Sequence, residues 1–195
     1  GWSFYDDEKE KSYIPSSPEN AKNKLYIKNL DGKGRIKSIN LPIENEMDFQ
    51  ARMLADWWNG VDNSFFGLIV GWKDWDNYTE FSITPNGYYK VEIYKKGVNL
   101  GMEKYEKYTK GSLKSATVLN ILRMDNNLYF SIDGNAVYGS EVSSLEGSKI
   151  GVYHSGKQSI VFDNFNVSKS ASESSPYIAE SDDEDSGWNG NGSGI

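Results

Sequence analysis

The chain has 195 residues, no cysteine and a formal net charge of −7, with 37% hydrophobic and 14% aromatic residues. The negative charge argues against a nucleic-acid partner, since phosphate binding needs clustered Lys and Arg. The lack of cysteine excludes disulfides, thiolate metal sites and a cysteine nucleophile. No apolar run approaches the roughly 18 to 20 residues that span a bilayer, so we expect no membrane insertion.

Short strand-like segments separated by turn sequences follow one another up to residue 168. The dividers include "DGKG", "PNG", "KKG", "DGN" and "HSG", which are typical of β-turns. Residues 101–111 come nearest to a helix, but their length and lack of a cap favour a loop. The expected strands are 2–5, 24–29, 34–39, 47–56, 65–72, 77–84, 88–95, 116–124, 127–132, 136–138, 148–154 and 158–168.

Alternation of apolar and polar residues assigns the faces of several strands. Phe49, Ala51 and Met53 share one face of their strand, with polar residues between them. Residues 65–72 are apolar on both faces, which indicates a central strand. Short antiparallel strands with one apolar face pack as two sheets. The sequence therefore predicts an all-β fold: a two-sheet antiparallel β-sandwich of jelly-roll type.

The composition changes after residue 168. Residues 169–195 are rich in Ser and Gly and include the acidic run "DDED" at 182–185. Such a stretch buries too little apolar surface to offset the entropy lost on ordering. We therefore expect one sandwich domain at 1–168, followed by a flexible acidic linker at 169–195.

Three stretches of the chain resemble the strands of a known family. They are "DFQARMLADWWNGVDNSFFGLIVGWKDWDNYTEFSITPNGYYKV", "ATVLNILRMDNNLYFSIDGNAV" and "GSKIGVYHSGKQSIVFDNFNV". In this order they are similar to concanavalin A-like, laminin-G-like jelly-roll domains of bacterial multidomain proteins, over about residues 45–168. The resemblance implies a two-sheet sandwich that binds glycan or protein beside another domain. Its glucanase members carry E-x-D-x-x-E; the nearest string here, "IENEMD", has the wrong order, so no catalytic residue is carried over.

The two ends of the chain bear on its context. "WNGNGSGI" at 188–195 resembles the opening of trypsin-like serine peptidase domains, which implies a downstream domain of the same polypeptide as a partner. The alternative is the end of a plain Gly/Ser linker. Gly1 in place of Met suggests a processed or cloned start that an export signal could have preceded, so we expect an extracytoplasmic or cell-surface location.

Candidates for catalysis and metal binding are few. An acyl-transfer triad needs a histidine base, and the only histidine, His154, is expected at the surface or in a turn. Glu80 and Glu92 are the best carboxylate pair for glycoside hydrolysis; the alternative is two solvated residues paired with Lys90. "KDWDN" and "NLDGKG" depart from the calcium-loop pattern, so we expect their Asp and Asn residues to close turns. No cofactor or metal is predicted.

Exposed aromatic residues next to polar ones are the candidates for ligand binding, because sugar rings stack on flat side chains. If residues 47–95 form a four-strand meander, the tryptophan pairs at 57–58 and at 72 and 75 lie at opposite ends. Trp72 is expected in the core. One strand face offers a mixture of Tyr, Glu and Lys, for which an ordinary outer sheet face is the alternative. The candidate ligand-binding residues are Trp57, Trp58, Trp75, Tyr78, Glu80, Tyr88, Lys90, Glu92 and Tyr94.

These observations lead to three functional hypotheses. The first is a non-catalytic recognition module that binds an oligosaccharide or a protein or peptide ligand and is appended to a larger protein. The second is a glycoside hydrolase that uses paired carboxylates. The third is a structural spacer. The separation and burial of Glu80 and Glu92 discriminate between the first two, because hydrolysis needs both carboxyl groups in an open cleft.

Overall fold

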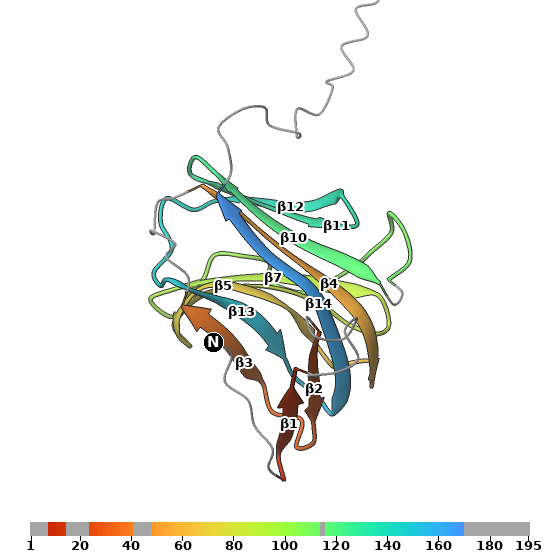
Figure 1. Cartoon of the computed structure of the whole chain (residues 1–195). Helices are drawn as coiled ribbons and strands as arrows, with labels where there is room; N and C mark the ends of the chain where they lie inside the picture. Colours follow the sequence, from red (N-terminus) through yellow and green to blue (C-terminus); the bar gives the residue numbers. More distant parts are fainter. Residues whose placement is uncertain (1–7, 15–23, 41–47, 114–115, 170–195) are drawn as a thin grey trace, which may run out of the picture.

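Two packed antiparallel sheets make up the part of the chain that the computed structural model describes, residues 8–14, 24–40, 48–113 and 116–169 (Figure 1). The expected all-β sandwich is confirmed. Within these ranges there is no helix long and apolar enough to cross a membrane. The expected strand at 2–5 and residues 170–195 of the expected linker lie outside the described residues.

Seven strands form the first sheet, sheet A, in the order β1-β2-β14-β4-β10-β11-β12. Strand β14, the last described strand, lies between β2 and β4, so segments far apart in the sequence are neighbours in this sheet (Figure 1). The strands are β1 (Glu10–Tyr13), β2 (Leu25–Asn29), β4 (Phe49–Gly60), β10 (Thr117–Met124), β11 (Asn127–Ile132), β12 (Asn135–Glu141) and β14 (Gln158–Lys169).

The second sheet, sheet B, has the order β3-β13-β5-β6-β7-β8, with β9 also paired to β7. Because β4 belongs to sheet A, the expected four-strand meander is wrong: of its four strands, β5, β6 and β7 are neighbours in sheet B. All other expected strands within the described ranges are present. The strands are β3 (Arg35–Asn40), β5 (Phe66–Asp74), β6 (Asn77–Ile83), β7 (Tyr88–Lys95), β8 (Val98–Asn99), β9 (Glu106–Lys107) and β13 (Lys149–His154).

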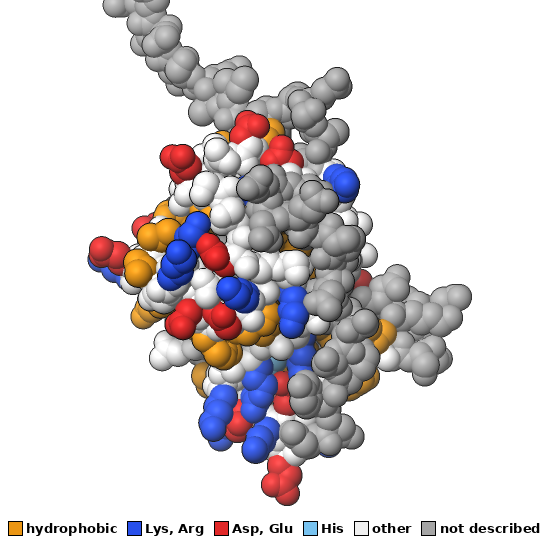
Figure 2. Space-filling model, turned by 90° about the vertical axis from the view of Figure 1, so that its left-hand side faces the viewer, with side chains coloured by type: hydrophobic (Ala, Val, Ile, Leu, Met, Phe, Trp, Pro, Cys, Tyr) orange, Lys and Arg blue, Asp and Glu red, His pale blue; other side chains and the backbone are white. Residues whose placement is uncertain are grey.

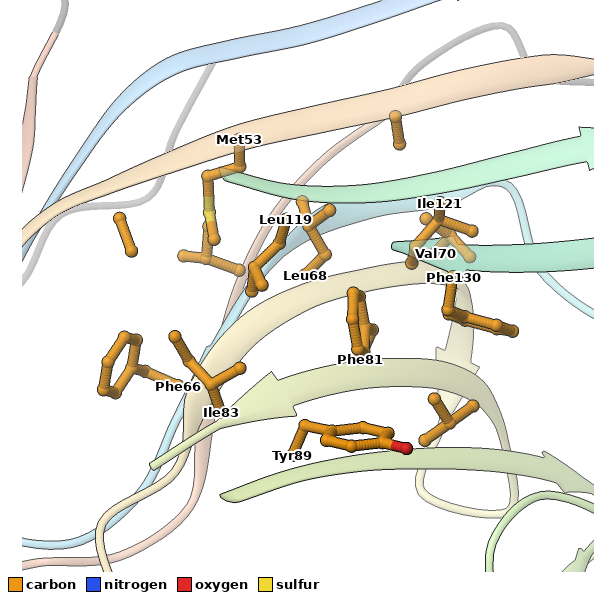
Figure 3. Packing of buried hydrophobic residues seen from close by; sticks show 14 of the residues in the cluster. Met53, Phe66, Leu68, Val70, Phe81, Ile83, Tyr89, Leu119, Ile121 and Phe130 are labelled. Carbon is orange, nitrogen blue, oxygen red and sulfur yellow. The ribbon is translucent and has the colours of Figure 1, made fainter. Parts of the chain in front are cut away.

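The hydrophobic core fills the space between the sheets. Met53 and Phe130 of sheet A face Phe66, Leu68 and Phe81 of sheet B, and all five side chains are fully buried (Figure 3). Phe81 meets Phe130 edge to face, with ring centroids 5.4 Å apart. The alternation expected for β4 is confirmed, because Phe49, Ala51 and Met53 point into this core.

Strand β1 was not expected, because its inward positions are polar. Glu10 is buried between the sheets, where its carboxylate pairs with Lys37 at 2.5 Å and lies 3.5 Å from Arg35. Lys37 is only 2% exposed. A buried ion pair with further polar partners thus replaces the apolar contact that usually anchors an edge strand, and β1 is joined to sheet B through β3.

Candidate functional site

The outer face of β6 and β7 holds most of the candidate residues together. In the strand register Tyr78 lies opposite Tyr94, and Glu80 lies opposite Glu92. Ser82 lies opposite Lys90 in the same way. Residues two apart share a face of a strand, so these side chains form one continuous surface on the side of sheet B that faces away from the core.

Four aromatic rings gather at one end of this surface; we call them the Trp75 cluster. Tyr78 stacks on Tyr94 with centroids 5.0 Å apart and planes 20° apart. Trp72 packs against Tyr78 at 5.9 Å and against Trp75 at 4.9 Å, edge to face in the second case. Trp75 is 54% exposed. The cluster therefore presents one indole to solvent and holds it by edge contacts with Trp72 and Tyr78, while Tyr94 supports Tyr78.

Trp72 was expected in the core, and that expectation is wrong. Alternation from Phe66 would turn it inward, but the register shifts between Val70 and Asp74 where Gly71 has a φ of 63°. A positive φ is unstrained only for glycine, and a β-bulge reverses the facing of the residues that follow it. Trp72 is paired with Lys149, which is exposed, so Trp72 lies on the outer face of sheet B. The isolated glycine within an apolar strand was the sequence signal for this bulge.

The turn that carries Trp75 is closed by Asp74. Its Oδ1 accepts hydrogen bonds from the backbone N–H of Asp76, at 3.0 Å, and from Nδ2 of Asn77, at 2.8 Å. The carboxylate of Asp31 likewise accepts from the backbone N–H of Lys33. These side chains close turns, as expected from the sequence, and the first of them fixes the loop on which the exposed indole sits.

Polar groups occupy the middle of the surface. The Tyr78 hydroxyl donates to Glu92 Oε2 at 3.0 Å, and Glu92 is also ion-paired with Lys90. Burial raises the pKa of Glu80 to about 8, and the charge of Glu92 reinforces the shift. Glu80 is only 5% exposed. The alternative of two solvated residues paired with Lys90 therefore holds for the pairing of Glu92 but not for Glu80, which is buried.

A hollow adjoins the two tryptophans. It has a volume of about 340 Å³ and is lined by Trp72, Trp75, Gly34, residues 35–38 of the edge strand β3, and residues 9 and 10 of the N-terminal segment. On the side of the molecule shown in Figure 2, basic and acidic side chains of the described residues are interspersed, with hydrophobic ones between them. Aromatic walls beside hydrogen-bonding groups suit a ligand with apolar faces and hydroxyl edges.

Tyr88 belongs to a different cluster at the other end of β7. Its ring meets Tyr105 edge to face at 5.4 Å, and Tyr105 lies 5.9 Å from Phe65. The Lys107 ammonium lies 4.7 Å from the Tyr88 centroid, within cation–π range. Tyr88 and Trp75 are thus separated by the length of the β6–β7 hairpin, about 20 Å for six residues.

The pair Trp57–Trp58 lies on the other sheet. Trp58 packs inward against Phe66, with centroids 5.2 Å apart. Trp57 is 46% exposed on the outer face of sheet A. Neither ring belongs to the Trp75 cluster, so the chain presents separate aromatic surfaces on its two sheets.

His154 is fully buried, so the expectation of a surface histidine is wrong. Its Nδ1 accepts a hydrogen bond from Asn29 Nδ2 at 3.2 Å, which places the ring proton on Nε2, 3.5 Å from Glu10. Burial, with the nearby charges of Lys37 and Arg35, lowers its pKa to about 3. The neutral ring is part of the buried network under β1. In the described ranges no group of three or more His, Asp or Glu residues could hold a metal ion.

Comparison with known proteins identifies the fold. No family model matches the chain, and no curated protein matches its sequence. Among solved structures, the carbohydrate-binding module CBM66 from Bacillus subtilis has a TM-score of 0.52 at 13% identity, over 87% of this chain and 91% of that one. A protein of unknown function with a galectin-like fold from Bacillus subtilis has a TM-score of 0.57 at 11% identity, over 86% and 89%.

A glycoside hydrolase is also similar in structure. The GH43 protein BlXynB from Bacillus licheniformis has a TM-score of 0.56 at 12% identity, over 85% of this chain and 40% of that one. At such low identities the comparisons show the fold alone. This chain is a β-sandwich of the jelly-roll, galectin-like kind, a fold that it shares with a carbohydrate-binding module and with part of a glycoside hydrolase. The likeness of residues 188–195 to peptidase domains lies outside the described residues.

Proposed function

We propose that this domain is a non-catalytic glycan-binding module whose ligand binds at the Trp75 cluster. One observation carries the proposal: a half-exposed indole packs edge to face against two further rings and lies beside a hollow lined by polar and aromatic groups. The carbohydrate-binding module with the same fold supports the choice of ligand class.

The chemistry of the cluster suits a sugar. The exposed face of Trp75 can stack on the C–H face of a pyranose ring, because both surfaces are flat and apolar. Glu92, Lys90 and the rim of the hollow provide acceptors and donors for hydroxyl groups. Because Trp72 and Tyr78 already hold the indole in place, binding costs little side-chain entropy.

Glycoside hydrolysis is the second candidate, and one observation favours it. Directly opposite residues of antiparallel strands have Cβ atoms about 5 Å apart, so Glu80 and Glu92 bring their carboxyl groups close together. The raised pKa of Glu80 is also the kind of shift a general acid needs. Against this, Glu80 is only 5% exposed, which leaves a substrate little access to its carboxyl group. We therefore favour binding without bond cleavage.

The wider context is part of the proposal. We propose that the module is appended to a larger protein, lies outside the cytoplasm, and positions a neighbouring domain on a glycan surface. A protein or peptide ligand and a purely structural spacer are the competing roles, and the following test separates them from glycan binding.

Glycan-array screening followed by calorimetric titration with the best soluble oligosaccharide tests the proposal. We expect Trp75→Ala to weaken binding about three- to tenfold, the value of one lost stacking contact. Tyr88→Ala, about 20 Å away on the same face, and Val98→Ala, an exposed residue of β8, serve as matched controls and should bind as the unmodified chain does. Incubation with the same oligosaccharide should release no shorter product.

Three results would count against the proposal. Product formation that Glu80→Gln abolishes would establish the hydrolase instead. Equal affinities for Trp75→Ala and the controls would move the ligand away from this cluster. An array with no bound glycan would leave the spacer or protein-binding role as the better account.

A further inference from the structure

Three aromatic side chains form a row across the outer face of sheet A. In the strand register Tyr13 lies opposite Tyr26, Tyr26 lies opposite Val161, and Val161 lies opposite Trp57. Neighbouring strands are about 4.8 Å apart, so the row extends over about 14 Å from β1 to β4. We call these four residues the sheet A row.

The sheet A row is exposed at its two ends, and Val161 in its middle is 7% exposed. The rings of Tyr13 and Tyr26 are stacked, with centroids 5.2 Å apart and planes only 9° apart. Tyr13 is 54% exposed and Trp57 46% exposed. The residues of the row, together with Ile27 and Ile160, line a hollow of about 500 Å³. Large rings exposed together in this way are uncommon on a sheet face unless they contact a ligand or partner.

A β-bulge in β4 explains why polar groups adjoin the row on one side. Val161 pairs with Trp57 while the next residue, Phe162, pairs with Ala55, so Asp56 is an extra residue in the strand. A bulge of this kind re-aims the neighbouring side chain. The carboxylate of Asp56 accepts a hydrogen bond from Lys24 Nζ at 2.7 Å.

Hydrogen-bonding side chains also flank the row on its other side. Two residues further along the strands, Lys11 lies opposite Lys28, and Lys28 lies opposite Ser159. All three, like Asp56, line the same hollow. The row is therefore an apolar strip between two polar edges. The ion pair of Lys24 with Asp56 lies on one side. The hydrogen-bond donors Lys11, Lys28 and Ser159 lie on the other.

We propose that the sheet A row is a second binding site, which takes the flat face of an extended glycan chain lying across the strands. The spacing of the strands is close to the advance of such a chain per sugar ring, so successive rings can meet Trp57, Val161 and Tyr26. The flanking amines, hydroxyl and carboxylate match the hydroxyl edges of the sugars. The choice of ligand class rests on the proposed function, although the site itself is independent of the Trp75 cluster.

The size of the surface argues against a second copy of this chain as the occupant. A strip about 14 Å long and two or three residues wide covers on the order of 100 Å², whereas a stable protein dimer buries about 800 Å² on each partner. A single glycan strand needs no larger surface than the row offers.

Retention on insoluble polysaccharide tests the site. Microcrystalline cellulose and insoluble xylan serve as probes, with the full chain and its Trp57→Ala, Tyr13→Ala, Trp75→Ala and Val98→Ala variants. We expect Trp57→Ala and Tyr13→Ala to lower retention about three- to tenfold each, and Val98→Ala to have no effect. Both ring variants change exposed side chains, so a matching thermal midpoint will show that they remain folded.

The outcomes separate this site from the Trp75 cluster. If Trp57→Ala and Tyr13→Ala are retained as well as the unmodified chain, the second site is refuted, even if Trp75→Ala loses soluble oligosaccharide binding. If retention falls only in the Trp57 and Tyr13 variants, and Trp75→Ala binds the soluble oligosaccharide as the unmodified chain does, the second site stands while the Trp75 cluster fails. Lack of retention on both probes also refutes the second site. So does a dimer in light scattering that Trp57→Ala dissociates, because the row would then be a self-association surface.

Discussion

Glu80 is a buried acid within the proposed glycan site. It lies directly opposite Glu92, and burial raises its pKa to about 8 from the usual 4.5. At neutral pH the folded protein therefore holds a proton that the unfolded chain has released. The free energy of unfolding accordingly falls as the pH rises from about 4.5 to 8.

Glu80→Gln tests this pH dependence, because glutamine has the shape of the protonated acid and no charge. We expect the variant and the unmodified chain to have similar stability near pH 4. Above pH 5 the variant should become progressively more stable relative to the unmodified chain, by at most about 1.4 kcal/mol per pH unit for one proton. Urea unfolding between pH 4 and 9 measures the difference.

The quantity to compare is the difference in the free energy of unfolding between the variant and the unmodified chain, because His154 gives both chains a pH dependence of the opposite sign. Its lowered pKa of about 3 makes the free energy of unfolding fall as the pH drops from 6.5 towards 3, in both chains alike. A constant difference in stability across the pH range would contradict the buried-acid interpretation of Glu80.

At the level of elements, the strands were predictable where inward positions are apolar. Simple alternation predicted strand β4, because its inward positions are the apolar residues Phe49, Ala51 and Met53. Strand β1 gave no such signal, because its inward Glu10 is stabilised by partners such as Lys37 and Arg35, which are distant in the sequence. Contacts of this kind depend on tertiary structure, and a period-two pattern cannot reveal them.

Bulges caused the other differences between expected and observed facing. Alternation assigned Trp72 to the core, but the bulge at Gly71 turned it outward and completed the Trp75 cluster. The candidate face of β6 and β7 has no such interruption, and the sequence placed Tyr78 and Glu92 on it correctly. Alternation therefore predicts which face of a strand a side chain occupies only up to the first bulge in that strand.

The buried pair Glu10–Lys37 offers a prediction about how β1 is attached. Glu10→Ala removes the carboxylate that faces Lys37 and Arg35, and loss of one member of a buried pair costs about 3–5 kcal/mol. Lys24→Ala, which breaks the partly exposed pair with Asp56, should cost less than about 1 kcal/mol. Chemical unfolding of both variants measures the two losses.

A double substitution gives a further check on this pair. Glu10→Leu combined with Lys37→Met replaces the two charges with apolar side chains of similar length, and it should restore much of the stability that Glu10→Ala loses. If Glu10→Ala costs no more than Lys24→Ala, the buried pair does not anchor β1.

At the scale of the whole molecule, the fold depends on the C-terminal strand. Strand β14 lies between β2 and β4, so it joins the N-terminal strands to the rest of sheet A. Its Phe162 is 1% exposed in the core. This position in the middle of the sheet could not be read from the sequence, which indicated only that the segment is a strand, because strand order depends on pairing between distant segments.

Two shortened chains test the proposed domain boundary at residues 168–169. A chain that ends at Lys169 keeps every described strand, and we expect its thermal midpoint to stay within about 2 °C of that of the full chain, since a Ser/Gly-rich acidic segment contributes little to a core. A chain that ends at Ile160 loses Phe162 and most of the backbone pairing of β14 with β2 and β4. It should show no cooperative transition in calorimetry, because an unfilled core and unpaired strand edges appear together. A large fall in the midpoint of the first chain would place part of the domain beyond Lys169, and cooperative melting of the second would show that the sandwich closes without β14.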